Sequence, residues 1–87
     1  MTEILYGKEE LISVEKALPN NNYTITMLFS NGETRLYNAR ELLEKPVFKA
    51  LNSKVFFLTA KAMYGTVVWN DDIDLDPEYL YENSILV

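Results

Sequence analysis

Closely spaced carboxylates are the feature of this chain most able to do chemistry, because they can hold a divalent cation. Four aspartates lie within six residues near the end of the sequence: Asp71, Asp72, Asp74 and Asp76. A calcium loop has a glycine at position six and a bidentate glutamate at position twelve. Counted from Asp72, these positions hold Pro77 and Asn83. The spacing fails the calcium pattern, so we expect no metal site and no other cofactor.

The same segment has a structural interpretation. Ile73 and Leu75 alternate with the aspartates, so an extended backbone would turn both apolar side chains inward and the carboxylates toward water. Asp76 comes directly before Pro77 and Glu78, an order typical of a helix N-terminus with Asp as N-cap and proline at the first helical position. We therefore expect an exposed acidic segment that leads into a C-terminal helix.

Other catalytic patterns lack the residues or the spacing that they need. Glu78 and Glu82 lie four apart and could act as paired acids, but nothing predicts that either is buried. The chain has no histidine and no cysteine, which excludes a Ser-His pair, a thiol nucleophile and a disulfide. A Ser-Lys pair has no spacing signal, and three isolated glycines cannot form a phosphate loop. We predict that the protein is not an enzyme and has no catalytic residue.

Charge is distributed unevenly along the 87 residues, whose net charge is −5. Residues 35–61 hold six basic and two acidic side chains, whereas residues 62–87 hold six acidic side chains and no base. Tyr37 and Phe48 lie in the basic segment, where they could stack on nucleic-acid bases. A nucleic-acid-binding domain is usually basic overall, however, so we expect a protein partner rather than nucleic acid.

Hydrophobic patterns and turn residues predict the elements that would position these side chains. Strands are expected at residues 11–18, 23–29, 34–37, 56–63 and 66–69. Asn38 and Glu41 have capping-box spacing at the start of a short helix, and Pro46 ends or redirects that helix. A further turn or two of helix is expected from Val47 to Leu51.

Two turns set the expected strand pairing. A two-residue turn at Asn31-Gly32 would pair Phe29 with Thr34, and Met27 with Leu36 on the core face. The second turn, at Tyr64-Gly65, sets a second register.

In that second hairpin, Ala62 would lie opposite Val67 and Ala60 opposite Trp69. Small residues across from a large indole are typical of a packed sheet face, so we expect Trp69 in the core.

These elements predict an α+β fold: a small antiparallel sheet in the order β-ββ-α-ββ-α, with short helices packed on one face. The length predicts a single α+β domain over residues 1–87. The longest wholly apolar run has four residues, Val55 to Leu58, which is too short for a membrane span. The first ten residues have no signal-peptide pattern, so we expect a cytoplasmic protein.

Three phrases of the sequence occur in the order typical of one bacterial family. They are Phe29-Ser30-Asn31-Gly32-Glu33 with Arg35 and Tyr37; Leu42-Leu43 through Val47-Phe48 to Leu51; and Gly65-Thr66-Val67-Val68-Trp69 followed by Asp74-Leu75, Pro77-Glu78, Leu80-Tyr81 and Ser84. Over residues 12–84 the chain thus resembles the domain-of-unknown-function 2442 family (DUF 2442). The most specific phrase is the last one, a tryptophan followed by Asp-Leu-x-Pro-Glu-x-Leu-Tyr.

The resemblance implies a small α+β domain of bacterial, mostly cytoplasmic proteins without an established biochemical activity. Some members of the family are joined to a helix-turn-helix DNA-binding domain, and others are thought to be encoded beside small toxin-like proteins. No such extension follows Val87 in this sequence, so we expect no DNA binding by fusion.

We predict a non-enzymatic protein-interaction or regulatory module, antitoxin-like in the sense of that resemblance, which binds a protein or forms a weak homodimer. The alternative is a subunit of a nucleic-acid-associated transcriptional regulator, and an undetected enzyme comes third. An open sheet edge can accept another strand, and six tyrosines offer contact groups. The candidate contact residues are Arg35, Tyr37, Asp72, Asp74, Glu78, Tyr79, Tyr81 and Glu82. The candidate structural residues are Asn31, Gly32, Trp69, Asp76 and Pro77.

Overall fold

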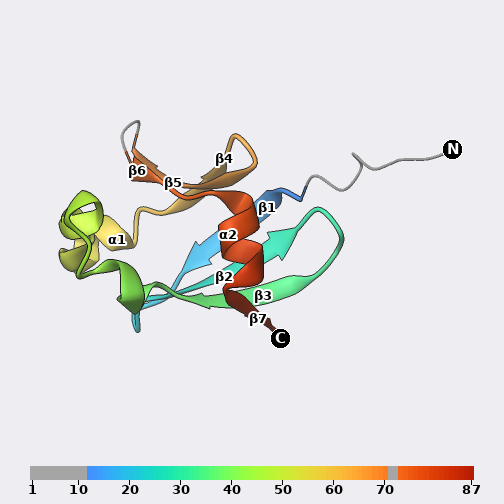
Figure 1. Cartoon of the computed structure of the whole chain (residues 1–87), viewed down its shortest axis with the longest axis horizontal. Helices are drawn as coiled ribbons and strands as arrows, with labels where there is room; N and C mark the ends of the chain where they lie inside the picture. Colours follow the sequence, from blue (N-terminus) through green and yellow to red (C-terminus); the bar gives the residue numbers. More distant parts are fainter. Residues whose placement is uncertain (1–11, 71–72) are drawn as a thin grey trace, which may run out of the picture.

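The computed structural model describes residues 12–70 and 73–87, which form two antiparallel sheets and several short helices (Figure 1). The first sheet has the strand order β1-β2-β3-β7, with β1 at Val14–Pro19, β2 at Thr24–Phe29, β3 at Thr34–Asn38 and β7 at Ser84–Leu86. The second has the order β4-β5-β6, with β4 at Lys61–Met63, β5 at Thr66–Asn70 and β6 at Ile73–Asp74. The helices are η2 at Ala39–Leu42, η3 at Pro46–Asn52, α1 at Lys54–Phe57 and α2 at Pro77–Glu82.

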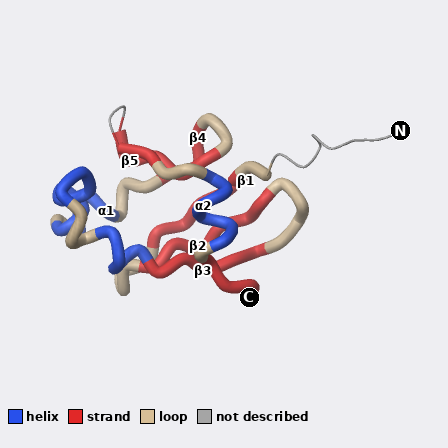
Figure 2. The backbone as a smooth tube through the Cα atoms, viewed as in Figure 1, coloured by secondary structure: helices blue, strands red, loops and turns tan. Residues whose placement is uncertain are grey.

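The α+β class is confirmed, with the strands divided over two sheets instead of one. The helices η2, η3 and α1 gather at one end of the molecule (Figure 2). Helix α2 crosses the four-stranded sheet, with its N-terminal end toward β4–β6 and its C-terminal end leading into β7 (Figure 1). None of the described helices is long and apolar enough to cross a membrane.

One hydrophobic core joins both sheets and the helices. The strands of the two sheets contribute Ile25, Met27, Phe29, Tyr37, Val67 and Trp69, and the helices contribute Ala39, Leu42, Leu51, Phe57 and Leu80. Alternate residues of β2 are buried, as expected for a strand with one face on the core. The other face of the four-stranded sheet therefore points away from this core.

The β2–β3 hairpin differs from the predicted register by one residue. Leu36 lies opposite Thr26 instead of Met27, and the same shift applies at Thr34. A one-residue shift moves side chains to the opposite face of a sheet. Tyr37 therefore takes the buried position that was expected for Leu36.

The turn of this hairpin explains the shift. The Gly32 N–H donates to the Phe29 carbonyl, and the Phe29 N–H donates to the Glu33 carbonyl. Gly32 has a φ of 89°, whereas Asn31 is not among the described residues with positive φ. The turn is therefore a three-residue loop with a bulged glycine, and not the two-residue turn that the Asn-Gly pair predicted.

The β4–β5 hairpin has the predicted register, because Ala62 pairs with Val67 across a turn in which Tyr64 and Gly65 both have positive φ. Its first strand is much shorter than predicted. Residues 54–57 form α1, since the Ser53 side chain accepts a hydrogen bond at the start of that helix. Residues 56–60 therefore do not extend β4, and the expected pairing of Ala60 with Trp69 is not made.

The helices at Ala39 and Pro77 start where the sequence predicts, but their capping hydrogen bonds are not the predicted ones. The Asn38 side chain accepts from the Arg40 N–H, whereas Glu41 bonds elsewhere and does not complete a capping box. Asp76 and Pro77 occupy the N-cap and first positions of α2, yet the Asp76 side chain makes no capping hydrogen bond.

Candidate functional site

Arg35 lies at the junction of β3, α2 and β7 and has little exposure. Its Nε donates to Ser84 Oγ at 2.9 Å, and one terminal nitrogen donates to the Ser84 carbonyl at 2.8 Å. The other terminal nitrogen bonds Glu33 at 2.8 Å and, as the largest cause, lowers the pKa of that carboxyl. The guanidinium also lies over the Tyr81 ring, 4.3 Å from its centre. These contacts fasten the C-terminal segment to the sheet, which is a structural role for a predicted contact residue.

Tyr37 is fully buried, so its side chain is not available to a partner. Its hydroxyl donates to Glu41 at 2.7 Å and lies 3.1 Å from the Tyr79 hydroxyl, which also donates to Glu41. The bonds from Tyr79 and then Tyr37 lower the pKa of Glu41. Burial raises the pKa of both tyrosines, and the bond to Glu41 adds to this effect. The cluster holds a carboxylate and two neutral phenols, and it ties η2 to α2.

The predicted acidic contact residues, unlike Arg35 and Tyr37, are open to solvent where the structure describes them. Asp74, Glu78 and Glu82 are exposed, whereas Asp72 lies outside the described residues. Tyr81 is half-buried, and its hydroxyl accepts from the Asn31 side chain at 3.3 Å. Within residues 12–70 and 73–87, no cluster of three or more acidic side chains could hold a metal ion.

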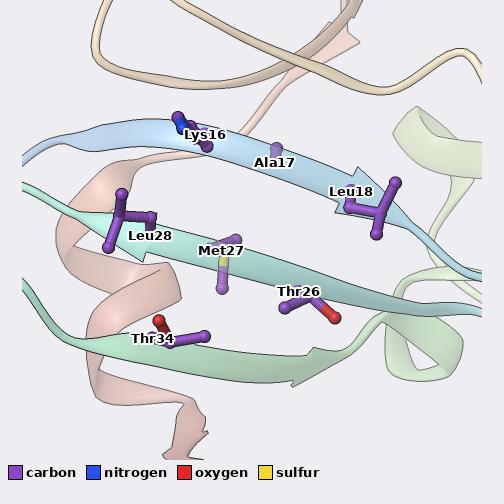
Figure 3. Close-up of a pocket in the computed structure, with 7 residues that line it drawn as sticks. All are labelled: Lys16, Ala17, Leu18, Thr26, Met27, Leu28 and Thr34. Carbon is purple, nitrogen blue, oxygen red and sulfur yellow. The ribbon is translucent and has the colours of Figure 1, made fainter.

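The outer face of the four-stranded sheet is a surface that the sequence did not single out. We define it by eight positions in two rows across the strands: Lys16, Leu28, Thr34 and Val87 in the first, and Leu18, Thr26, Leu36 and Ile85 in the second. Figure 3 shows five of these side chains, those of Lys16, Leu18, Thr26, Leu28 and Thr34, around a shallow, open hollow of about 490 Å³, with α2 behind the strands. Lys16 is the one charged residue among the eight positions.

Much of the outer face is apolar and exposed to solvent. The exposed fractions of Leu18, Ile85 and Val87 are 62%, 63% and 67%. Leu28 and Leu36 are half-buried between them. A sheet face of this kind can bind an apolar surface of another molecule, because that contact removes the side chains from water.

The free side of β7 borders the outer face, because β7 is the last strand in the order of this sheet. A strand at this position leaves backbone N–H and C=O groups open to pairing. The sequence contains a weak signal for β7, the uncharged run from Ser84 to Val87, but four residues after a helix do not specify a distant partner strand.

The first and the third of the phrases that carry the family resemblance meet in space at α2. The ring of Phe29 contacts that of Tyr81 edge to face at 5.2 Å, and Arg35 joins Tyr81 to Ser84. A comparison with curated proteins and with solved structures found no match. The model of a family described as "Protein of unknown function (DUF2442)" matches residues 14–85, from the start of β1 into β7, which confirms the resemblance. The chain belongs to the DUF2442 family of proteins of unknown function.

Proposed function

We propose that this domain is a non-enzymatic protein-interaction module that binds an apolar segment of a partner protein on the outer face. The observation that carries the proposal is the row of exposed leucine, isoleucine and valine side chains on a sheet face that points away from the core. A regulatory, antitoxin-like role would be one use of such binding. A cytoplasmic location remains a prediction from the sequence.

Charge supports an apolar partner segment for this face. The chain carries a net charge of −5, yet seven of the eight outer-face positions are uncharged. Protein interfaces are depleted of charged residues at their centre, whereas a surface that binds a phosphate backbone is basic. The outer face has the composition of the first kind of surface.

The polar clusters on the opposite side support a non-enzymatic role. Glu41 accepts bonds from two tyrosine hydroxyls, and Arg35 bonds Glu33 and Ser84. These groups satisfy one another and hold the elements together, which differs from a catalytic group that is open to a substrate.

Capture from the native lysate with matched variants tests the outer face. Leu18→Lys places a charge on this face, and Val55→Lys places one on α1, where Val55 is 80% exposed. We expect a protein that binds the wild type and the Val55 variant but not the Leu18 variant. Equal capture by all three proteins, or the absence of any captured protein, would contradict the proposal.

A second candidate function is nucleic-acid association as part of a transcriptional regulator. The observation that favours it is a set of cations between the start of η2 and the start of β4 that form no ion pair with other described residues: Arg40, Lys45, Lys49, Lys54 and Lys61. Here we expect binding of a DNA duplex that weakens steeply with salt and is lost in a Lys45→Glu, Lys49→Glu double variant. An unchanged affinity in this variant would exclude the cations as the contact surface.

A further inference from the structure

The edge strands of the two sheets differ in their protection against pairing with another chain. Natural sheets protect their edges with charged residues, proline and bulges. Strand β1 has Glu15, Lys16 and Pro19 and an irregular register between Val14 and Lys16. Strand β4 has Lys61, and the two-residue β6 contains Asp74 and pairs through an irregular register.

Strand β7 has none of these protections. Its residues Ser84, Ile85 and Leu86 are uncharged, contain no proline and pair with β3 in a regular register. Ile85 and Leu86 are both exposed by more than 60%. Among the described edge strands, β7 is therefore the one best suited to accept another strand.

The backbone of β7 shows which groups are open. The Val87 N–H donates to the Thr34 carbonyl, so this antiparallel pair is a hydrogen-bonded one. Hydrogen-bonded and non-hydrogen-bonded pairs alternate along antiparallel strands, which makes the pair of Arg35 and Leu86 a non-hydrogen-bonded one. The N–H and C=O groups of Leu86 thus point away from β3, toward the free side of the sheet.

We infer that the partner of β7 is β7 of a second copy, paired antiparallel about a two-fold axis. The inference rests on the proposed interaction role and adds a second contact to it, between two copies of the chain at the edge of the sheet. A two-fold axis makes one patch serve both chains, so an unprotected edge is complementary to itself. The open Leu86 groups bond across the axis, and the two outer faces become one continuous apolar surface through Ile85 and Val87.

The dimer is weak and responds to salt in an unusual direction. A three-residue strand buries much less than the roughly 1,200–2,000 Å² of a stable interface, so we expect a dissociation constant between about 1 μM and 1 mM. Pairing brings together two copies of net charge −5, with Glu78 and Glu82 of α2 exposed next to β7. Salt screens this repulsion but does not weaken the strand pairing, so higher salt should tighten the dimer.

A backbone-specific variant tests the inference. Leu86→Pro removes the outward N–H and keeps the bonds to β3, whereas the control Leu86→Ala removes the side chain and keeps the N–H. Light scattering after size exclusion should give a mass that rises toward two copies with concentration for the wild type and the alanine variant. The proline variant should stay a monomer at the same concentrations, with a dissociation constant at least about tenfold higher than that of the wild type. Its circular dichroism spectrum should be unchanged.

Cross-linking provides a second measurement if the proline variant does not fold. The chain has no cysteine, so Leu86→Cys introduces a single thiol on the two-fold axis, directly opposite the same residue of the second copy, and Val55→Cys places one on α1. Oxidation should link the Leu86 cysteine variant into a covalent dimer far faster than the Val55 variant. Equal rates, or a monomer at every concentration up to about 1 mM, overturn the homodimer.

The outcomes separate this inference from the proposed function. A monomer that captures a protein through Leu18 overturns the homodimer and leaves the interaction role in place. Dissociation of the dimer by added salt would show a charge-based contact, and it also overturns strand pairing through β7. Loss of dimerization in Leu86→Ala as well as in Leu86→Pro assigns the contact to the side chain and overturns the backbone mechanism.

Discussion

Trp69 connects β5 to the helical end of the core through both its ring and its indole N–H. The side chain is 5% exposed, its N–H donates to the Phe57 carbonyl at 2.9 Å, and its ring centre lies 6.1 Å from that of Phe57. This position is structural. The indole hydrogen bond to Phe57 is made in place of the predicted strand pairing of Trp69 with Ala60. One substitution can remove the hydrogen bond and keep part of the ring packing, whereas another removes both.

We predict that Trp69→Ala lowers the free energy of unfolding by about 3–5 kcal/mol, as truncation of a buried aromatic usually does. Trp69→Phe keeps part of the ring and removes the indole donor, while the Phe57 carbonyl still accepts from the Ala60 N–H, so the lost hydrogen bond itself should cost about 0.5–1.5 kcal/mol. Urea denaturation followed by circular dichroism measures both changes. An alanine variant as stable as the wild type would show that the indole is not part of the core.

Glu41 makes stability depend on acid pH through its two tyrosine partners. Its pKa is lowered in the folded protein, first by the bond from Tyr79 and then by that from Tyr37. A lowered folded-state pKa stabilises the fold above the unfolded value of 4.5 and loses this contribution as pH falls through the folded value. The contribution is therefore present at neutral pH and lost in acid.

We predict that Tyr79→Phe raises the pKa of Glu41 and removes stability at pH 7 but much less at pH 3. An NMR titration of the Glu41 side-chain carboxyl measures the pKa, and thermal melts at the two pH values measure the stability. Tyr64→Phe is the matched control, because Tyr64 is 88% exposed. The same loss of stability at both pH values would show that Glu41 does not cause it.

At the scale of the elements, two glycine turns with similar backbone angles differ in their surroundings. Gly32 has a φ of 89° and no atom within 4 Å of an added Cβ, whereas Gly65 has a φ of 79° and would place that Cβ 3.3 Å from the Cβ of Ser13. The Gly65 carbonyl also accepts the Val14 N–H, so its turn is attached to β1.

We therefore predict that Gly65→Ala destabilises the domain more than Gly32→Ala. The Gly32 variant bears only the cost of a left-handed backbone, about 1–2 kcal/mol, while the Gly65 variant must also move the β4–β5 turn away from β1. Chemical denaturation of both variants under one set of conditions compares them. Equal losses would mean that the turn moves freely relative to β1.

These turns also show what the sequence could and could not predict. The register at Ala62 and Val67 followed from a short turn, because the residues that decide it are local. At Leu36 the prediction was wrong by one residue, because either a two-residue or a three-residue loop can contain Asn31-Gly32, and the two place opposite faces of the strand inward.

The candidate site depends on contacts between residues far apart in the sequence, which local sequence patterns do not predict. Arg35 was predicted to face a partner, but it bonds Ser84, which is 49 residues away. Strand β7 has three residues and pairs with β3 at a similar separation in the sequence. Only the completed fold therefore shows that β7 is an edge strand of the four-stranded sheet. The outer face became visible only when the register of β3 was known.

For the whole molecule, the shared core predicts one cooperative unfolding transition. Both sheets and the helices contribute to a single cluster of buried side chains, and the Val14 N–H bonds the Gly65 carbonyl between the sheets. We predict that fluorescence of Trp69, the only tryptophan, and far-UV circular dichroism give the same melting temperature and urea midpoint. Two separated midpoints would mean that the three-stranded sheet unfolds by itself.

The pairing of β3 with β7 has a consequence for the chain during its synthesis. Strand β3 leaves the ribosome about 50 residues before its partner, which corresponds to several seconds at roughly 5–20 residues per second. Until Ser84 emerges, the nascent chain exposes β3 as an unfinished edge, and Arg35 has no Ser84 to bond. A ribosome that pauses within α2 would prolong this state, so the rate of translation through residues 77–82 should influence how much of the protein aggregates in the cell.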